Sequence, residues 1–298
     1  MDRSTWWNSR EIGAFRYEGE FEGKKAVLKI QGVKPITSEI YMIKSFAKAN
    51  KSKILRPSLL YGYLDWDEKM RYEALVLEFV EGKRIVQNPT NEGEIDEFFK
   101  LREEYRGNCV ADPWIEKPGS SLSEEAKLNF EKWRQASFRL FPTHPSRKPE
   151  DKNLIDSAVK ILVKNYGGVV AEFQHGHFST TDLLKTKKGE VIVLSNLYWS
   201  WKPPFYDAVF GYHWYIYNLA NLNSVTPALI EQQRNLWMSK INRLAKTEKD
   251  RVLLNLALLE RATAGLNLDV LSIDPKNPVA EYLICRTREN IQTFLAKF

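Results

Sequence analysis

The alternation of apolar and polar positions in the first part of the chain predicts a small sheet with one helix. Four strands are expected, at residues 15–21, 25–30, 59–63 and 72–79. Glu22-Gly23-Lys24 supplies the turn between the first two strands, and an acidic turn is expected at residues 65–68. Residues 38–49 carry apolar side chains at helical spacing, which predicts an amphipathic helix.

Glu81-Gly82-Lys83 interrupts this pattern, and the rest of the chain is predicted to be mainly helical. Helices are expected at residues 94–105, 121–138, 153–165, 207–220, 227–246, 251–264 and 279–296, with one short buried strand at 190–194. Ser121 and Glu124 form a capping-box signature at the start of the second helix. Residues 251–264 are apolar nearly all round, which indicates an interior helix, and Gly265 is expected to cap it.

These elements predict the α+β fold class, divided into a β-rich part with one helix at 1–80 and a mainly helical part at 81–298. Apolar residues make up 43% and charged residues 28% of the chain, a balance that argues against disorder. No apolar run approaches the roughly 18 residues of a membrane span. The N-terminus lacks the apolar segment and cleavage site of a secretory signal, so a cytoplasmic location without a membrane partner is expected.

The cysteines and the net charge say little about the function. Cys109 and Cys285 are far apart and not in a metal or redox spacing, so both are expected to be buried and reduced. The formal charge of +6 suits anionic partners such as nucleotides, but it is too small to choose among them. Aromatic and basic residues do not interleave as in a single-strand binding groove, so nucleic acid is not the expected partner.

The segment most informative about function is Gln174-His175-Gly176-His177-Phe178-Ser179-Thr180-Thr181-Asp182-Leu183-Leu184. A phosphoryl-transfer loop needs a carboxylate that receives the proton of the substrate hydroxyl. Five residues later it needs an amide or carboxylate that holds Mg²⁺. His177 occupies the first of these positions and Asp182 the second. The segment has the frame of a kinase catalytic loop with altered chemistry.

A resemblance to a known family emerges from several segments taken in order. Those segments are Val27-Leu28-Lys29, Glu39, Leu77-Glu78-Phe79-Val80-Glu81-Gly82, His175-Gly176 and Asp207. Together they resemble the aminoglycoside phosphotransferase and choline kinase-like family over residues 25–265. The resemblance implies a protein-kinase-like two-lobed fold, with a small β-rich N-lobe and a larger, mainly helical C-lobe. It also implies a nucleotide partner, with ATP and Mg²⁺ as cofactors.

The resemblance implies that Lys29 reaches the nucleotide phosphates and that Glu39 pairs with Lys29, since an ammonium in a cleft needs a partner to hold it. The alternative is that both side chains are solvated. Glu78 to Val80 would link the lobes and offer backbone groups to an adenine edge; alternatively they end an edge strand. The Gly-rich loop over the phosphates is reduced to residues 9–13, which lowers the expected affinity.

The sequence departs from the family where charge matters most. His177 replaces the catalytic Asp and Asp182 replaces the metal-binding Asn. Ser195, followed by Asn196, stands where the resemblance implies a second metal-binding carboxylate. A neutral imidazole can accept a proton but supplies no negative charge, whereas Asp182 is a competent Mg²⁺ ligand. Ordinary phosphoryl transfer is therefore not expected, because positioned metal and electrostatics are most of what a kinase contributes.

Three features carry alternative interpretations. Asp207 matches a family aspartate that ties down the backbone of the catalytic loop, and a helix N-cap is a compatible role. His175 and His177 with Asp182 could hold zinc, although the resemblance already explains His175 as loop structure. A band of aromatic residues is expected to pack between elements rather than to form a stacking wall. Its members are Tyr198, Trp199, Trp201, Phe205, Tyr206, Tyr212, Trp214 and Tyr215.

Two functions of different classes follow from these residues. The first is a pseudokinase that binds nucleotide weakly or not at all and acts through an unidentified protein or small-molecule partner. The second is an atypical ATP-dependent small-molecule phosphotransferase, with Asp182 as metal ligand and His177 as base or phosphate-facing group. A nucleic-acid or ribosome-associated binder that uses the net positive charge is a third, less favoured alternative.

Overall fold

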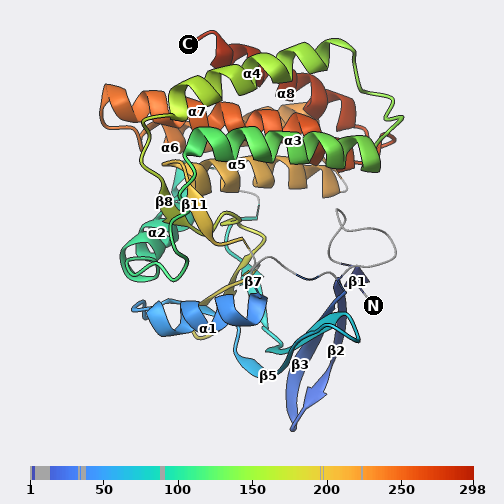
Figure 1. Ribbon diagram of the computed structural model, residues 1–298, viewed down its shortest axis with the longest axis vertical. Helices are drawn as coiled ribbons and strands as arrows, with labels where there is room; N and C mark the ends of the chain where they lie inside the picture. The colour runs from blue at the N-terminus through green and yellow to red at the C-terminus, as the bar shows by residue number, and fades with distance from the viewer. Residues whose placement is uncertain are drawn as a thin grey trace. The chain divides into compact units, whose positions relative to one another are not determined.

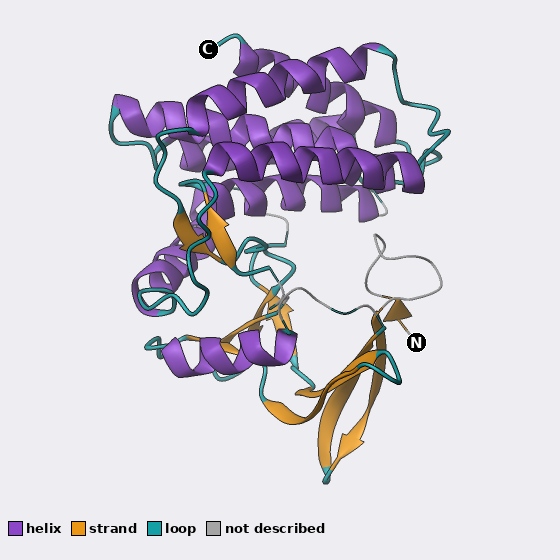
Figure 2. Ribbon diagram, in the orientation of Figure 1, coloured by secondary structure: helices purple, strands orange, loops and turns teal. Residues whose placement is uncertain are grey.

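The computed structural model describes residues 2–3, 14–32, 34, 38–87, 91–194, 196, 198–222 and 224–298. The chain forms two compact units. One comprises residues 1–85, 100–116 and 180–199, and the other comprises residues 86–99, 117–179 and 200–298. Each unit is described by itself. The secondary structure is coloured by type in Figure 2; most strands belong to the first unit and most helices to the second.

The first unit is built on an antiparallel sheet of five strands in the order β1-β2-β3-β6-β5. Its strands are β1 (Asp2–Arg3), β2 (Ala14–Phe21), β3 (Lys24–Gln31), β5 (Leu60–Asp67) and β6 (Tyr72–Glu78). Helix α1 (Glu39–Ala49) packs on the sheet through Ile40 and Ile43, which meet Leu75 in a buried cluster. All four predicted strands are present, and β1 adds an edge strand that the sequence did not predict.

The predicted turn at residues 65–68 lies later in the chain than expected. Strand β5 continues to Asp67, and the turn follows at residues 68–71. The Asp67 side chain closes this turn, because its Oδ1 accepts hydrogen bonds from the backbone N–H of Lys69 (2.8 Å) and Met70 (2.6 Å). An aspartate at the first position of a turn binds backbone two residues ahead, which places the turn after Asp67.

A second, four-stranded sheet in the first unit has the order β4-β10-β9-β7. Its strands are β4 (Leu55–Pro57), β7 (Gly82–Arg84), β9 (Leu183–Thr186) and β10 (Val191–Val193). The predicted buried strand is the inner strand β10, whose three residues are all buried. Strands β4 and β10 run parallel, so residues 55–57 lie beside the strand that follows the candidate catalytic loop.

The second unit is a bundle of helices with one small β-ribbon. Figure 1 shows α3, α4, α5 and α7 running alongside one another within it. The helices are α2 (Glu92–Asn108, shared with the first unit), α3 (Leu122–Leu140), α4 (Glu150–Tyr166), α5 (Tyr206–Asn218), α6 (Pro227–Asn242), α7 (Glu248–Ala264) and α8 (Ala280–Leu295). Strands β8 (Glu172–Gln174) and β11 (Ser200–Lys202) pair antiparallel. Every predicted helix is present, and the capping box of Ser121 and Glu124 is confirmed.

Gly265 does not cap α7 as predicted. Its backbone is right-handed helical (φ −56°, ψ −47°), and the chain continues through a π-helical turn, Gly265–Asp269, and a 3-10 turn, Val270–Ser272. A Cβ at position 265 would overlap the Tyr217 hydroxyl and lie 3.0 Å from Tyr217 Cζ. The glycine is needed for close approach of α5 rather than for a left-handed cap.

Two smaller expectations concern burial and membranes. Cys109 is buried and Cys285 is only partly buried, and both are free thiols, so the expected burial of Cys285 was wrong. The described residues include no helix that is both long and apolar enough to cross a membrane.

Gly211 gives a test of the bundle's packing. An added Cβ there would overlap Phe98, lying 2.9 Å from Cε2, and would lie 3.1 Å from the Phe178 carbonyl oxygen. Gly211→Ala should therefore lower the free energy of unfolding by about 1–3 kcal/mol in denaturant titrations. Gly107→Ala is the matched control, because a Cβ at this exposed position of α2 meets nothing within 4 Å. It should raise stability by up to about 1 kcal/mol, and equal effects at the two positions would contradict this packing.

Candidate functional site

Lys29 and Glu39 form a buried ion pair. Lys29 lies on β3 opposite Leu75 of β6, on the face that α1 covers, and Glu39 is the first residue of α1. Only 5% of Lys29 and 3% of Glu39 are exposed, and Lys29 Nζ donates a hydrogen bond to Glu39 Oε2. The structure therefore confirms the paired arrangement and excludes the alternative in which both side chains are solvated.

Two polar residues that the sequence analysis missed extend this pair. Gln31 Nε2 donates to Glu39 Oε2 and to Glu73 Oε1, both at 2.8 Å. Gln31 and Glu73 are directly opposite each other on β3 and β6, and Glu73 is fully buried. The signal was present in the alternation of β6, because residue 73 shares the face of Leu75, the residue that packs under α1.

The predicted lobe linker begins with a residue whose side chain is structural. Glu78 accepts two hydrogen bonds from the Arg56 guanidinium, at 2.7 and 3.0 Å, and one from the Leu59 N–H. Burial raises the pKa of Glu78, but the bonds from Arg56 outweigh it and leave the pKa below its usual range. The Glu78 N–H is also occupied, since it donates to the Leu59 carbonyl at 2.8 Å.

Val80 is the linker residue best placed to offer its backbone. The Phe79 N–H donates to the Lys25 carbonyl at 3.3 Å, so two of the three linker N–H groups serve the sheet. Within the described part of the chain, the N–H and C=O of Val80 have no hydrogen-bond partner. A half-buried peptide group of this kind has bonding capacity left for a ligand.

Asp207 fixes the backbone of the candidate catalytic loop. Its Oδ2 accepts from the His175 N–H at 3.0 Å and its Oδ1 from the Gly176 N–H at 2.9 Å. Asp207 is the second residue of α5, and α5 has no side-chain cap, so the loop-anchor role is confirmed and the N-cap role was wrong. Gly176 has a φ of +75°, which only glycine adopts without strain.

The backbone around Asp207 is also held by hydrogen bonds, which come from the Gln174 side chain. Gln174 Oε1 accepts from the Asp207 N–H at 3.0 Å, and Gln174 Nε2 donates to the Pro203 carbonyl at 2.8 Å. Phe205, just before α5, has a φ of +67°, a conformation that costs a residue with a side chain about 1–2 kcal/mol. These contacts hold the carboxylate against the loop, so the loop's shape is specified from both sides.

His177 lies against aromatic rings of α5. The centroid of the His177 ring is 4.5 Å from that of Phe210 and 5.2 Å from that of Trp214. The Phe210 and Trp214 rings stack on each other with their centroids 5.8 Å apart. The Arg261 guanidinium lies 4.9 Å from the Phe210 centroid and donates to Asp269 Oδ2 at 2.7 Å. Burial raises the pKa of Asp269, while the charges of Arg261 and His177 act in the opposite direction. A buried carboxylate therefore lies within electrostatic reach of His177.

The expected metal-binding positions belong to the first unit, with Asp182 in the last part of the candidate catalytic loop and Asn196 after it. Asp182 is partly buried, and its carbonyl oxygen accepts from the Leu194 N–H at 2.8 Å. Asn196 is 3% exposed, its Nδ2 donates to the Val193 carbonyl at 3.4 Å, and its Oδ1 is buried without a partner among the residues that the structure describes. Ser195, the predicted replacement for a carboxylate, lies outside the described residues, as does the reduced phosphate loop at residues 9–13.

The zinc interpretation of the two histidines is wrong. In the described ranges, no group of three or more His, Cys, Asp or Glu side chains is arranged to hold a metal ion. His175 is fully buried, and its Nδ1 accepts from the His177 N–H at 3.2 Å. Nδ1 of His175 therefore binds the backbone of the loop rather than a metal ion.

The predicted aromatic band divides between the two units and packs in each. In the first unit, Trp199 is buried against Phe46 (4.9 Å), Tyr105 (5.3 Å) and Trp114 (4.5 Å between ring centroids). In the second unit, Tyr206 continues the stack of Phe210 and Trp214 along α5. Trp214 stays partly exposed at the end of this stack, beside His177.

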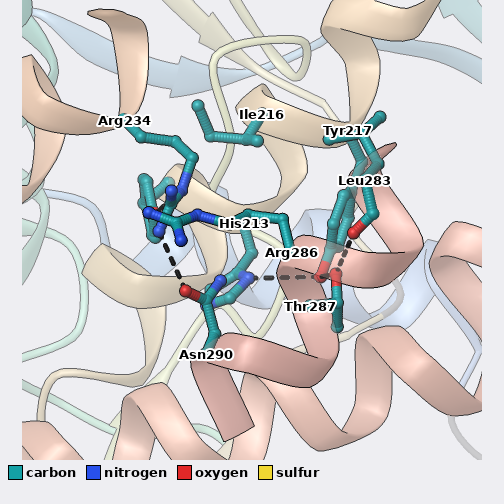
Figure 3. A pocket seen from close by; sticks show the side chains of 9 residues that line it. His213, Ile216, Tyr217, Arg234, Leu283, Arg286, Thr287 and Asn290 are labelled. Atoms are coloured by element: carbon teal, nitrogen blue, oxygen red, sulfur yellow. Dashed lines mark hydrogen bonds between the residues drawn. The ribbon is translucent and has the colours of Figure 1, made fainter. Parts of the chain in front are cut away.

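A small polar cavity lies in the helical unit, between α5, α6 and α8. Figure 3 shows His213, Tyr217 and Thr287 joined through the Tyr217 hydroxyl, and Arg234 bonded to Asn290. Its volume of about 10 Å³ is that of roughly one water molecule. Burial lowers the pKa of His213 well below its usual value, and the charges of Arg261 and Arg234 add to this effect. The cavity is too small for a substrate.

Comparison with solved structures shows which fold this is. No family model and no curated protein matches the sequence. The structure is similar to a thermostable mutant of the aminoglycoside phosphotransferase APH(4)-Ia in a ternary complex with ADP and hygromycin B. The identity is 13%, the match covers 97% of this chain and 91% of that one, and the TM-score is 0.56.

Two further structures show the same likeness. One is an aminoglycoside phosphotransferase from Alicyclobacillus acidocaldarius, with 10% identity, coverage of 100% and 91%, and a TM-score of 0.53. The other is the amicoumacin kinase hAmiN in complex with AMP-PNP, Ca²⁺ and Ami, with 13% identity, coverage of 96% and 86%, and a TM-score of 0.57.

The chain has the two-lobed α+β fold of these kinases. The likeness runs over the whole chain, from the N-terminal sheet to the mostly helical remainder, so the predicted fold is confirmed. Identities of 10–13% establish the fold and nothing about activity. The chemistry has to be argued from this chain's own residues.

The Asp207 anchor can be tested directly. Asp207→Ala removes a buried acceptor from two loop N–H groups and should lower the free energy of unfolding by about 3 kcal/mol. In native-state hydrogen exchange, the His175 and Gly176 amides should lose protection before the rest of the helical unit. Asp65→Ala, at an exposed aspartate, is the control and should leave both amides protected. Unchanged protection of these amides in Asp207→Ala would rule out the anchoring role.

Proposed function

We propose that this protein is a pseudokinase that binds an adenine nucleotide weakly and acts through a partner, a protein or a small molecule, rather than by efficient phosphoryl transfer. The observation that carries the proposal is a contrast. The Lys29–Glu39 pair and the Asp207 loop anchor are both fully built, while His177 stands where phosphoryl transfer needs a carboxylate. The residues proposed to bind the nucleotide and to fix the loop backbone are present, whereas the residue proposed to accept the proton is a histidine rather than an acid.

The nucleotide grip rests on residues of the first unit. Lys29, oriented by Glu39, would hold phosphate oxygens, and the free N–H and C=O of Val80 would pair with the edge of adenine. Two of the similar proteins carry ADP or AMP-PNP in their solved structures, which supports this choice of ligand. The near-complete burial of Lys29 supports weak affinity, since a phosphate has to compete with Glu39 for the ammonium.

The residues present fit a magnesium ion only in part. Asn196 offers a buried amide oxygen with no partner among the described residues, and Asp182 offers one carboxylate, both hard oxygen ligands. Mg²⁺ held there with a nucleotide would neutralise phosphate charge. With a single carboxylate among these two residues, the chain itself supplies little charge to retain the ion. Metal binding is therefore expected to depend on the nucleotide.

His177 is poorly suited to the work of the missing carboxylate. The His177 ring packs on Phe210 and Trp214. Near neutral pH an imidazole is either neutral or positively charged, never negative. It can take a proton from a hydroxyl but cannot supply the negative charge that balances a cationic metal beside it. Phosphoryl transfer with His177 as the proton acceptor is therefore expected to be slow.

A small-molecule phosphotransferase is the second candidate, and one observation favours it. Asp269, on the π-helical turn, lies close enough to His177 for their charges to interact, and Arg261 holds its carboxylate in place. An acidic group near a histidine can orient the ring and stabilise the imidazolium that forms when a general base accepts a proton. In that case His177 would be a working base rather than a relic of the loop.

Nucleotide binding is the first test. Calorimetry with ATP and ADP, with and without Mg²⁺, should show weak binding that Lys29→Met reduces by at least about tenfold. Lys25→Met is the matched control, because Lys25 lies on the same strand but is exposed in its pair with Glu81, and it should bind like the wild type. Thermal unfolding of both variants shows whether they are folded. A folded Lys29→Met that binds ATP as tightly as the wild type would defeat the proposal.

Substitution of His177 separates the two candidate functions. If the protein is a pseudokinase, His177→Ala leaves ATP turnover at background, and His177→Asp raises it by about tenfold or more by restoring a carboxylate. If it is a phosphotransferase, the wild type turns over ATP with an acceptor hydroxyl. His177→Ala then loses about a hundredfold or more of that rate, and Asp269→Asn also lowers it. Steady turnover by the wild type would exclude the pseudokinase.

A further inference from the structure

A single amide joins two buried carboxylates next to Lys29. The side chain of Gln31 carries two N–H bonds on Nε2, and both are used, one by Glu39 and one by Glu73, each at 2.8 Å. The oxygen of Glu39 that accepts from Gln31 is the same oxygen that accepts from Lys29. Strand β6 is thus linked through Gln31 to the ion pair.

Glu73 also takes the place of a cap at the start of α1. Ser38 precedes the helix, but its side chain makes no capping bond. Instead the Ser38 hydroxyl donates to Glu73 Oε2 at 3.4 Å, and the backbone of Glu39 favours the ionised Glu73 carboxylate, which acts against the rise of its pKa. A negative charge at a helix N-terminus is favourable, so Glu73 holds the turn of α1 that carries Glu39.

The cluster contains two carboxyl groups and one amino group. Lys29, Glu39 and Glu73 are exposed by 5%, 3% and 0%, so none has water to screen it. With one ammonium and two carboxylates ionised, the sum is −1. Burial raises the pKa of Glu73, and the neighbouring charge of Glu39 raises it further. A phosphate that approached Lys29 would meet the charge of both carboxylates.

We propose that Glu73 is a positioning residue that holds Glu39 against Lys29 through Gln31, and that its charge limits how tightly Lys29 can hold a phosphate. The inference rests on the proposed nucleotide binding and deepens it, because it names the residue that sets the affinity. A second buried carboxylate near the ammonium weakens the field that an anionic ligand feels at Lys29. The network gives rigidity and low affinity together.

Glu73→Gln separates shape from charge. A glutamine keeps the size of the side chain, its carbonyl oxygen can still accept from Gln31, and its amide can donate to Ser38. In calorimetry, Glu73→Gln should bind ATP and ADP about fivefold to tenfold more tightly than the wild type. Its affinity for adenosine, which has no phosphate, should be unchanged.

Glu20→Gln is the matched control. It removes the same charge from the same unit at an exposed position of β2, and it should leave all three affinities unchanged. Gln31→Leu, which cuts the link between the carboxylates, should weaken ATP binding because Glu39 and Lys29 lose their support. Equal ATP affinity of Glu73→Gln and wild type, or an equal gain for adenosine, would overturn the inference.

The pH dependence of stability gives a readout without nucleotide. The folded-state pKa of Glu73 is raised above its unfolded value of about 4.3, so its ionisation destabilises the fold as pH rises through the folded pKa. Glu73→Gln should therefore gain stability relative to the wild type with rising pH. The groups facing Glu73 are Lys29 and Gln31 from β3 and Ser38 and Glu39 from α1. A stability difference that does not vary with pH would contradict a charged Glu73.

The outcomes also separate this inference from the proposed function. If neither the wild type nor Glu73→Gln binds ATP, the proposed nucleotide binding has failed. If the wild type binds ATP and Lys29→Met does not, but Glu73→Gln leaves the ATP affinity unchanged, the nucleotide grip stands and the role of Glu73 has failed.

Discussion

Lys29 and Glu39 are both removed from water, and removal of either partner would leave the other as an uncompensated group in the interior. Their pairing fixes where α1 begins on the sheet, because Glu39 is its first residue and Ile40 and Ile43 follow it into the apolar cluster around Leu75. A lysine needed only for folding would be replaced at little loss by an apolar side chain of similar volume. The ion pair therefore points to a requirement for the ammonium itself.

A second buried charge plays the corresponding part in the helical unit. Asp207 accepts hydrogen bonds from two backbone N–H groups, so its carboxylate fixes the shape of one loop. That loop contains Gly176, whose positive φ the turn requires, and His177 follows it directly. A protein that needed only a stable core would not need the strained Phe205 beside the anchor.

The success and failure of the sequence predictions have physical causes. Alternation and helical spacing located the strands and helices because burial imposes those periods. The pairing of Lys29 with Glu39 and the loop contact of Asp207 were predicted from the resemblance. Glu73 was missed because a charged side chain is usually expected to face solvent, although the alternation of β6 places it on the face of buried Leu75; its partner Gln31 follows only from the register of β3 and β6. Gly265 was misassigned because close approach by Tyr217 is a tertiary contact, and a glycine after a helix has the same signature as a cap.

The charge around Lys29 connects these observations. Glu39 and Glu73 place two carboxyl groups near one ammonium, whereas Asp182 and Asn196 together carry one carboxylate. On the proposed function, the carboxylates beside Lys29 would oppose a phosphate, and the single carboxylate of Asp182 would hold a metal ion weakly. Both features would then lower the affinity for a nucleotide–metal complex, while the Lys29–Glu39 pair and the Asp207 anchor keep their structural roles.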